Sequence, residues 1–532
     1  MSDKPLLGST IPTLLKARGI EVVFGIPGVH TVELYRGLPD SGLRHITPRH
    51  EQGAGFMADG YARATGKVAA CFIITGPGLL NIATAMAQAM ADSVPMLVIT
   101  TLNPRPTLGR GEGRLHELRG QSIVAREIAS LSLTVLTADQ LVPALDEAFA
   151  VFASARPGPV VIEIPIDLLS EPFLPDARVA PRPSRPAPDP AAVTQAAALL
   201  NAARRPMVFA GGGAVAAAAS FAGLVERLDA VTLLTANAKG LLPGGHPLLA
   251  GGNLPSQAVR GLIRASDALL VIGSELGETD LEYYGEGPIE VSGPLIRVDI
   301  DPRQFGRGIT PTLSITADAD AFLRALLPLI TQRAPTAAGA VAEVRARALA
   351  ELEPRIARHR PLIEAIWRVL PEAILAGDST EASYAAGLFA EPPAPRRFMS
   401  AATGFGTLGY ALPAAIGAKA GCPQAPVVCL IGDGGLHYTV PELAAAAEAG
   451  LPVIVLLWND QRYGEIEKFM IRRQMRTIGV ELFATDFRQV TQGFGATHVT
   501  AATMAEVETE LAAAAGRSTV TVIEMDAGRF GG

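Results

Sequence analysis

The chain has 532 residues, of which 49% are hydrophobic and 18% are charged, so it can bury several large cores. Its formal net charge of −7 argues against a binding surface for nucleic acid or for an anionic membrane. The three cysteines, Cys71, Cys422 and Cys429, have no CxxC spacing and predict a reducing compartment, the cytoplasm. We expect neither a secretory signal nor a membrane helix, because the first residues lack a basic segment followed by an apolar run and the longest apolar runs are strand-sized.

Two stretches rich in proline and alanine, 175–193 and 331–341, interrupt the chain. Outside them, short apolar runs alternate with helix-like segments, which is typical of α/β folds with parallel sheets. We therefore predict an α/β fold of three consecutive doubly wound parallel-sheet domains, at residues 1–178, 190–332 and 350–532. In the first domain we expect strands at 68–76 and 95–101 and a helix at 81–91.

The middle domain contains PMVFAGGGAVA at 206–216, a strand followed by the looser form of the dinucleotide fingerprint, G-x-G-x-x-A. No clear acid closes the second strand, at 231–240. This pattern predicts a Rossmann-like domain that binds no dinucleotide. A dinucleotide-dependent oxidoreductase built around the same turn is the alternative.

The last domain repeats the order of the first, with strands at 425–432 and 452–458 and a helix at 441–450. Asp433 lies in a glycine-rich turn after the first of these strands, and Asp460 follows the second. Such a turn suits a phosphate, and a carboxylate inside it requires a hard divalent cation between the two anions. We therefore predict a metal–diphosphate site. The alternative is that Asp433 caps a helix and Asp460 opens a turn.

This spacing resembles the diphosphate motif of thiamine diphosphate enzymes, because GDG at 432–434 is followed by 24 residues and then by ND at 459–460. The resemblance implies the Mg²⁺ ligands and the diphosphate turn: Asp433, Asp460, the backbone carbonyl of Arg462, Gly434 and Gly435. The family more often has asparagine at the position of Asp460, the second ligand, and usually a smaller residue at the position of Arg462, the third. Aspartate is an equally good oxygen ligand, but its extra charge leaves the metal affinity open.

The segment ITPRHEQGAGFMADGYARATG (46–66) resembles the pyrimidine-binding signature of the family. By that resemblance Glu51 is the glutamate that hydrogen-bonds the aminopyrimidine ring and activates the cofactor, whereas by itself it reads as an acid in a first helical turn. The resemblance implies further cofactor contacts: Pro77, Asn81, Ser379, Thr380, the carbonyl of Gly406, and Leu408 as an apolar wedge. Glu51 and Asp433 lie on different domains, and relatives complete each site from two chains. We therefore expect a homodimer or homotetramer with active sites at the dimer interface.

Three short motifs, GRLHEL (113–118), GSELGETD (273–280) and NDQRYGEIEKFM (459–470), resemble the 5-guanidino-2-oxopentanoate decarboxylases of arginine catabolism. Ile466 occupies a position where some decarboxylases of simple 2-oxo acids carry glutamate and acetolactate synthase-like enzymes are apolar. The stretch 273–285 lacks the arginine usual in flavin-binding acetolactate synthases, so FAD is possible but not favoured. The alternative function is an acetolactate synthase-type carboligase acting on pyruvate.

A guanidinium substrate calls for a carboxylate, and the acids near these motifs are Glu112, Glu117, Glu465 and Glu467. The alternative for the last two is a solvated helix face. His116 is a candidate acid or base near the substrate, or else a surface histidine. A non-catalytic homologue is a further alternative, which the presence of both Glu51 and Asp433 opposes.

Overall fold

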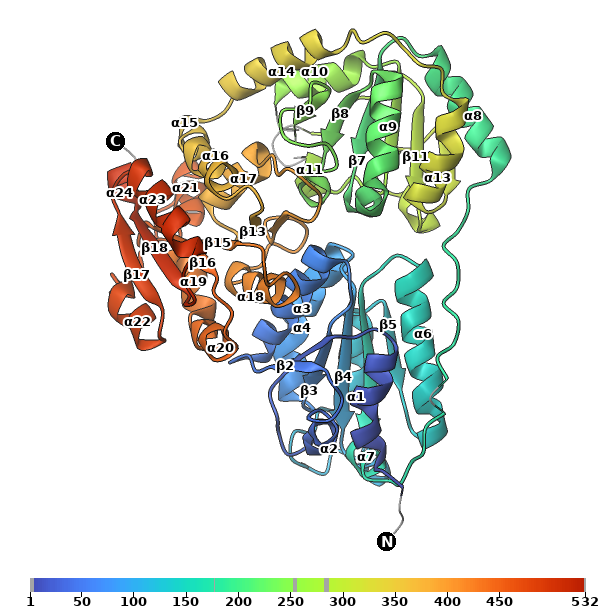
Figure 1. Ribbon diagram of the computed structural model, residues 1–532, viewed down its shortest axis with the longest axis vertical. Coiled ribbons are helices and arrows are strands. Elements are labelled where there is room, and N and C mark those ends of the chain that lie inside the picture. The colour runs from blue at the N-terminus through green and yellow to red at the C-terminus, as the bar shows by residue number, and fades with distance from the viewer. Residues whose placement is uncertain (1–3, 177, 252–255, 282–286, 531–532) are drawn as a thin grey trace. The chain divides into compact units, whose positions relative to one another are not determined.

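The computed structural model describes residues 4–176, 178–251, 256–281 and 287–530. In these ranges the strands form three six-stranded sheets whose strand pairs are parallel, and helices follow most of the strands (Figure 1). The predicted α/β fold with three parallel sheets is therefore confirmed. Within the described ranges, no helix combines the length and the apolar character needed to cross a bilayer.

The first and third sheets have the same topology. The first has the order β2-β1-β3-β4-β6-β5, with strands β1 Val22–Gly25, β2 Arg44–Ile46, β3 Ala70–Ile73, β4 Met96–Leu102, β5 Leu131–Thr134 and β6 Pro159–Pro165. The third has the order β14-β13-β15-β16-β18-β17, with strands β13 Ile374–Gly377, β14 Phe398–Ser400, β15 Val427–Gly432, β16 Ile454–Asn459, β17 Thr497–Ala501 and β18 Thr521–Asp526. Renumbered from its own first strand, each sheet has the order 2-1-3-4-6-5. The α/β unit predicted to recur is thus part of a repeated sheet.

The central sheet has the Rossmann strand order, 3-2-1-4-5-6 when read from β9. Its strands are β7 Pro206–Ala210, β8 Val231–Leu234, β9 Leu249–Gly251, β10 Ala268–Ile272, β11 Leu295–Asp299 and β12 Leu313–Thr316. The glycine turn after β7 packs on the turn after β10, where the Gly213 N–H donates to the Gly273 carbonyl at 3.0 Å. A Cβ on Gly211 would overlap that same carbonyl oxygen. Packing therefore accounts for the glycines of the fingerprint. Residues 282–285 of the stretch used to judge FAD lie outside the described residues.

Alternating side chains of the central strands enter two different cores. Met207 and Phe209 of β7 pack with α10 (Gln257–Ala265) and α14 (Ala338–Ala350). Val208 and Ala210 pack with α9 (Ala218–Leu228) and α13 (Ala319–Leu326) on the other face. Both faces are covered, which explains why such strands read as continuous apolar runs in the sequence.

The chain packs into two compact units. Unit 1 comprises Met1–Ser184, Phe405–Ala501 and Ala513–Asp526, and unit 2 comprises Arg185–Gly404, Ala502–Ala512 and Ala527–Gly532. The main helices of unit 1 are α1 Leu7–Ala17, α3 Glu51–Thr65, α4 Pro77–Ala91, α5 Gln121–Glu127, α6 Leu141–Ser154, α18 Ala411–Gly421, α19 Asp433–Thr439, α20 Glu442–Glu448, α21 Gly464–Arg472 and α22 Phe487–Gly493. Those of unit 2 include α8 Pro190–Ala202, α16 Arg360–Val369 and α17 Glu381–Phe389.

Within unit 1, α3 and α18 approach so closely that only glycine fits at the contacts. A Cβ on Gly60 would overlap the carbonyl oxygen of Ala414, and a Cβ on Gly417 would overlap that of Met57. The two glycine-rich helices therefore lie backbone against backbone, and this contact positions the N-terminus of α3, where Glu51 lies.

Candidate active site

Asp433 and Asp460 emerge at the same edge of the third sheet. β15 ends at Gly432 and lies parallel to β16, with Gly432 opposite Trp458, so the two strands end side by side. Asp433 is the first residue of α19 and is 2% exposed, and Asp460 follows β16 directly. The two carboxyl groups lie close enough for each to affect the pKa of the other. The structure thus brings together the two side chains that the sequence predicts as metal ligands.

Burial favours the protonated form of both carboxyl groups. It raises the pKa of Asp433, and burial together with the neighbouring Asp433 charge raises the pKa of Asp460 to about 7. Adjacent carboxyl groups of this kind can exchange their protons for a divalent cation. Within the described ranges no group of three or more histidine, cysteine, aspartate or glutamate side chains is placed to hold a metal. Mg²⁺ there would take its remaining oxygens from phosphate, water and backbone carbonyls.

The backbone turns sharply between Asp460 and Arg462, the third predicted ligand. Gln461 has a φ of 56°, a left-handed conformation that is uncommon outside glycine. Two backbone hydrogen bonds of 2.8 and 2.9 Å tie residues 461–463 to residues 480–482. The surrounding segment therefore fixes the spacing of these two predicted ligands.

Glu51 is the first residue of α3, and its carboxylate meets α4: Asn81 Nδ2 donates to Glu51 Oε2 at 2.9 Å. Pro77 is the first residue of α4, where its missing N–H costs no helical hydrogen bond. Gly76, before it, has a φ of 65°, which favours glycine. The predicted residues Glu51, Pro77 and Asn81 therefore gather around one helix end.

Glu442, at the start of α20, caps the N-terminus of α3. Its two carboxylate oxygens accept the N–H of Arg49 at 3.0 and 3.1 Å, and Oε1 also accepts the N–H of His50 at 3.2 Å. Gly53 leaves room for this, because a Cβ there would overlap Glu442 Oε1. Glu442 thereby fixes the two residues that precede Glu51. The sequence analysis missed this residue, although an acid inside the apolar helix ELAAAAEAG was an available signal.

The segment predicted to lie beneath the cofactor, 405–410, is anchored to α4. Gly406 is exposed with a φ of 70°, and Leu408 is half-buried. Between them, Thr407 donates its N–H and its hydroxyl to Gln88 Oε1, at 3.4 and 3.1 Å. The side chain of Gln88, which the sequence analysis also missed, therefore fixes the position of this segment relative to α4.

Gln88 continues into a buried polar network between α3, α4 and α18. Gln88 Nε2 and Arg63 Nη2 both donate to Asp92 Oδ2, at 2.6 and 2.7 Å. Arg63 Nε and the Tyr410 hydroxyl both donate to Asp59 Oδ1, each at 2.6 Å. Gln88, Asp59 and Tyr410 are fully buried. The charge of Asp59 therefore depends on its hydrogen-bond partners. The available sequence signal was an aspartate and an arginine four residues apart in α3.

In unit 2, Ser379 and Thr380 lie between β13 and α17. The Ser379 N–H donates to the Asp378 carboxylate at 2.9 Å, and the Thr380 N–H donates to the Asp378 carbonyl at 3.0 Å. The Ser379 hydroxyl is buried and has no hydrogen-bond partner among the described residues. A phosphate oxygen would satisfy it, because buried hydroxyl groups are normally hydrogen-bonded. The residues present therefore fit a phosphate ligand.

In the loop before α5, both predicted acids are paired locally. Glu112 forms ion pairs with Arg110 at 3.4 Å and Arg114 at 3.1 Å. The Glu117 carboxylate accepts the N–H groups of Gly111 and Arg114, each at 3.0 Å, and these bonds lower the pKa of Glu117. Glu117 therefore organises its own loop.

The two predicted acids of α21 also have local partners. Glu465 pairs with Lys468 at 3.1 Å, and Glu467 pairs with Arg462 at 3.0 Å. None of the α21 side chains is buried. Glu467 thus already contacts a guanidinium group, that of Arg462.

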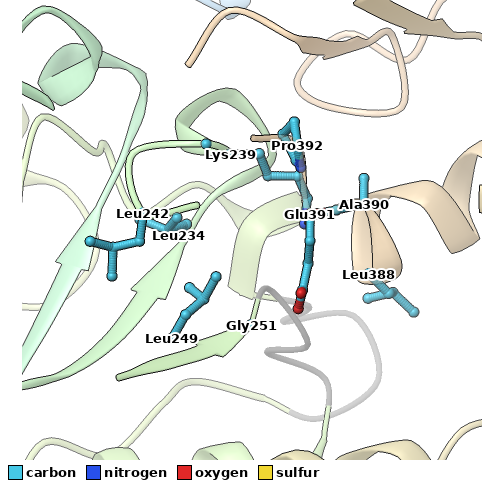
Figure 2. A pocket seen from close by; sticks show the side chains of 10 residues that line it. Leu234, Lys239, Leu242, Leu249, Gly251, Leu388, Ala390, Glu391 and Pro392 are labelled. Atoms are coloured by element: carbon cyan, nitrogen blue, oxygen red, sulfur yellow. The ribbon is translucent and has the colours of Figure 1, made fainter. Parts of the chain in front are cut away.

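A small cavity in unit 2 is lined by apolar side chains and by Lys239 and Glu391 (Figure 2). Lys239 Nζ donates to the Ala390 carbonyl at 3.0 Å, and burial lowers the pKa of Lys239 to about 8. The cavity volume is about 10 Å³, room for at most one water molecule. It is too small to be the binding site of a 2-oxo acid.

The sequence matches three thiamine pyrophosphate enzyme models: the N-terminal TPP binding domain at residues 7–123, the central domain at 193–326 and the C-terminal TPP binding domain at 378–525. It is 44% identical to the probable 2-ketoarginine decarboxylase AruI of Pseudomonas aeruginosa, over 97% of this chain and 93% of that protein. It is 33% identical to the acetolactate synthase isozyme 1 large subunit of Escherichia coli, over 90% of this chain and 86% of that protein. The chain therefore belongs to the thiamine pyrophosphate (thiamine diphosphate) enzyme family.

Proposed function

We propose that the protein is a thiamine diphosphate- and Mg²⁺-dependent 2-oxo acid decarboxylase whose substrate is 5-guanidino-2-oxopentanoate, also called 2-ketoarginine. The observation that carries the proposal is the 44% identity, over 97% of the chain, to the probable 2-ketoarginine decarboxylase. Identity to the acetolactate synthase of Escherichia coli is lower, 33%. A carboligase acting on pyruvate is therefore the second candidate.

We assign residues 1–178 to a pyrimidine-binding domain, 190–332 to a central Rossmann-like domain and 350–532 to a diphosphate-binding domain. Two observations support these boundaries. Each matched family segment falls inside one of the three ranges. Each range also contains the strands of one six-stranded sheet.

The cofactor residues keep the roles that the resemblance implies. Asp433, Asp460 and the carbonyl of Arg462 would hold Mg²⁺, and the backbone of Gly434 and Gly435 and the hydroxyls of Ser379 and Thr380 would hold the diphosphate. The raised pKa values of the two aspartates and the Ser379 hydroxyl, which has no hydrogen-bond partner among the described residues, support this assignment. Thiamine diphosphate would supply a nucleophilic carbon and a sink for the electrons released with CO₂.

Glu51 is the catalytic residue. Its carboxyl group would hydrogen-bond the aminopyrimidine ring of the cofactor and hold the proton that passes between the carboxyl group and that ring. The bond from Asn81 supports this role, because it fixes the Glu51 carboxylate at the end of α4. Pro77 contacts the pyrimidine, the Gly406 carbonyl accepts from its amino group, and Leu408 is the apolar wedge beneath the cofactor.

At the substrate end, we propose that Glu465 or Glu467 receives the guanidinium group and that His116 faces the 2-oxo acid. Glu112 and Glu117 are weaker candidates, since Glu112 lies between two arginines and Glu117 is bonded to its own loop. Glu465 and Glu467 lie in the first turn of α21, which directly follows the predicted metal ligands Asp460 and Arg462.

We further propose a homodimer or homotetramer with its active sites at the dimer interface. Exposed apolar side chains near the predicted site residues support it, including Leu80 at 48% and Phe405 at 55% exposure. The cytoplasmic location and the absence of FAD stay predictions. Light scattering tests the assembly, and absorbance at about 450 nm tests for flavin.

Kinetics with two substrates test the proposed function. The wild-type protein, supplied with thiamine diphosphate and Mg²⁺, should decarboxylate 5-guanidino-2-oxopentanoate faster than 2-oxohexanoate, which has no charged end. Glu465→Gln or Glu467→Gln should raise KM for the guanidino substrate only, and Glu448→Gln, at an exposed acid of α20, serves as the control. Equal KM values for all variants would contradict the proposed guanidinium site.

A further inference from the structure

Two histidines meet at the N-terminal end of α4. His30 lies in the turn after β1 and is 9% exposed, and His116 lies in the loop before α5. Their rings pack edge to face, with centroids 5.2 Å apart and an interplanar angle of 87°. His116 has a left-handed backbone, with a φ of 59°, and its carbonyl approaches so near to Gly76 that a Cβ there would overlap it. A strained residue and an obligatory glycine therefore hold the pair in place.

A buried chain of hydroxyl groups ends at His30. His30 Nδ1 lies 3.0 Å from Thr75 Oγ1, which lies 2.7 Å from Thr101 Oγ1. Thr101 Oγ1 already accepts the N–H of Thr75 at 3.1 Å. Each hydroxyl holds one proton and can accept two hydrogen bonds, so the chain can run from Thr101 toward His30 or in the opposite direction. Only the first direction makes His30 Nδ1 an acceptor and places the ring proton on Nε2.

We propose that the chain runs from Thr101 through Thr75 to His30, so that His30 accepts at Nδ1, stays neutral with its proton on Nε2 and fixes the position of the neighbouring His116 ring. The inference rests on the proposed function, in which His116 faces the substrate. His30 acts through His116 and is thus a positioning residue. The effect matters because decarboxylation of a 2-oxo acid anion to an aldehyde and CO₂ consumes one proton.

The acids nearest to the pair and to its chain have partners of their own. Glu117, next to His116 in the sequence, is bonded to the backbone of its own loop. The buried carboxylate of Glu163 accepts from Gln121 Nε2 at 3.1 Å, and the same nitrogen donates to the Thr101 carbonyl at 2.9 Å. Burial and the nearby His116 lower the pKa of His30, in agreement with a neutral ring.

Adjacent threonines of β4 provide a matched test. Thr101→Val keeps the side-chain shape but removes the hydroxyl that orients the chain. Thr100→Val is the control, because Thr100 Oγ1 is equally buried and has no hydrogen-bond partner among the described residues. Nitrogen NMR of the full-length, histidine-labelled protein without substrate reports the tautomer of each of its eight histidines, with His30→Asn and His116→Asn used for assignment.

In the wild type and in Thr100→Val, His30 should stay a neutral Nε2–H tautomer. In Thr101→Val, His30 should lose this single tautomer. The pH profile of kcat/KM should differ between Thr101→Val and the wild type. His30 signals unchanged in Thr101→Val, or a Thr100→Val effect of equal size, would overturn the proposal. If no variant turns over substrate, the proposed function fails while the NMR result still decides the chain.

Discussion

Unit 1 should lose stability as pH rises through about 7, and replacing Glu442 with glutamine should remove this loss. Glu442 is 1% exposed, and burial raises its pKa from 4.5 to about 7 despite the N–H groups of Arg49 and His50, which lower it. The folded state therefore binds a proton that the unfolded state has released between these two pH values. The stability from this group is complete below pH 4.5 and is lost as pH rises through 7. A shift of about 2.5 units corresponds to about 3 kcal/mol.

The assay is unfolding by urea or heat, at about pH 5 and about pH 8.5, of the wild type, Glu442→Gln and Glu448→Gln. Near pH 5 the wild type and Glu442→Gln should have similar free energies of unfolding, because a protonated Glu442 resembles glutamine. Near pH 8.5 Glu442→Gln should be more stable by up to about 3 kcal/mol. Glu448, an exposed residue of the same helix paired with Arg49, is the control and should show no such pH dependence. A Glu442→Gln difference that is the same at both pH values would refute the raised pKa.

Three further predictions concern packing and the cofactor. Gly417→Ala should separate α18 from Met57 and destabilise unit 1. Gly339→Ala, at a helix position with open space, should instead stabilise the protein by up to about 1 kcal/mol. Thermal unfolding measures both effects. Asp433→Asn should weaken Mg²⁺-dependent binding of thiamine diphosphate by about tenfold or more in calorimetry, and wild-type affinity should fall below about pH 7 as protonation of Asp460 competes with the metal. Glu51→Gln should bind the cofactor yet lose at least about a hundredfold in kcat, and equal activity would remove Glu51 from catalysis.

The strands and the proximity of Asp433 to Asp460 were predictable because their signals are local. An apolar run of the central sheet, such as residues 206–210, is visible because both faces of the sheet are covered. Asp433 and Asp460 were predicted together because parallel neighbouring strands end at one edge of a sheet. The repeated order of motifs in the first and last thirds anticipated two sheets of identical topology.

Contacts between distant segments were not predictable. Glu442 meets Arg49 across 393 residues of sequence, and Gln88 meets Thr407 across 319. Nothing in the pattern around Gln88 indicates which loop it contacts, because that depends on how closely the glycine-rich helices approach. The acids named for the guanidinium were visible as charges, but their local partners, such as Lys468 for Glu465, appeared only in the structure.

The most direct test of the proposed function is product analysis by proton NMR. The protein is incubated with thiamine diphosphate, Mg²⁺ and an equimolar mixture of pyruvate and 5-guanidino-2-oxopentanoate. We predict that 4-guanidinobutanal appears while pyruvate stays intact. Formation of acetolactate with the guanidino acid untouched would contradict the decarboxylase assignment and identify a carboligase.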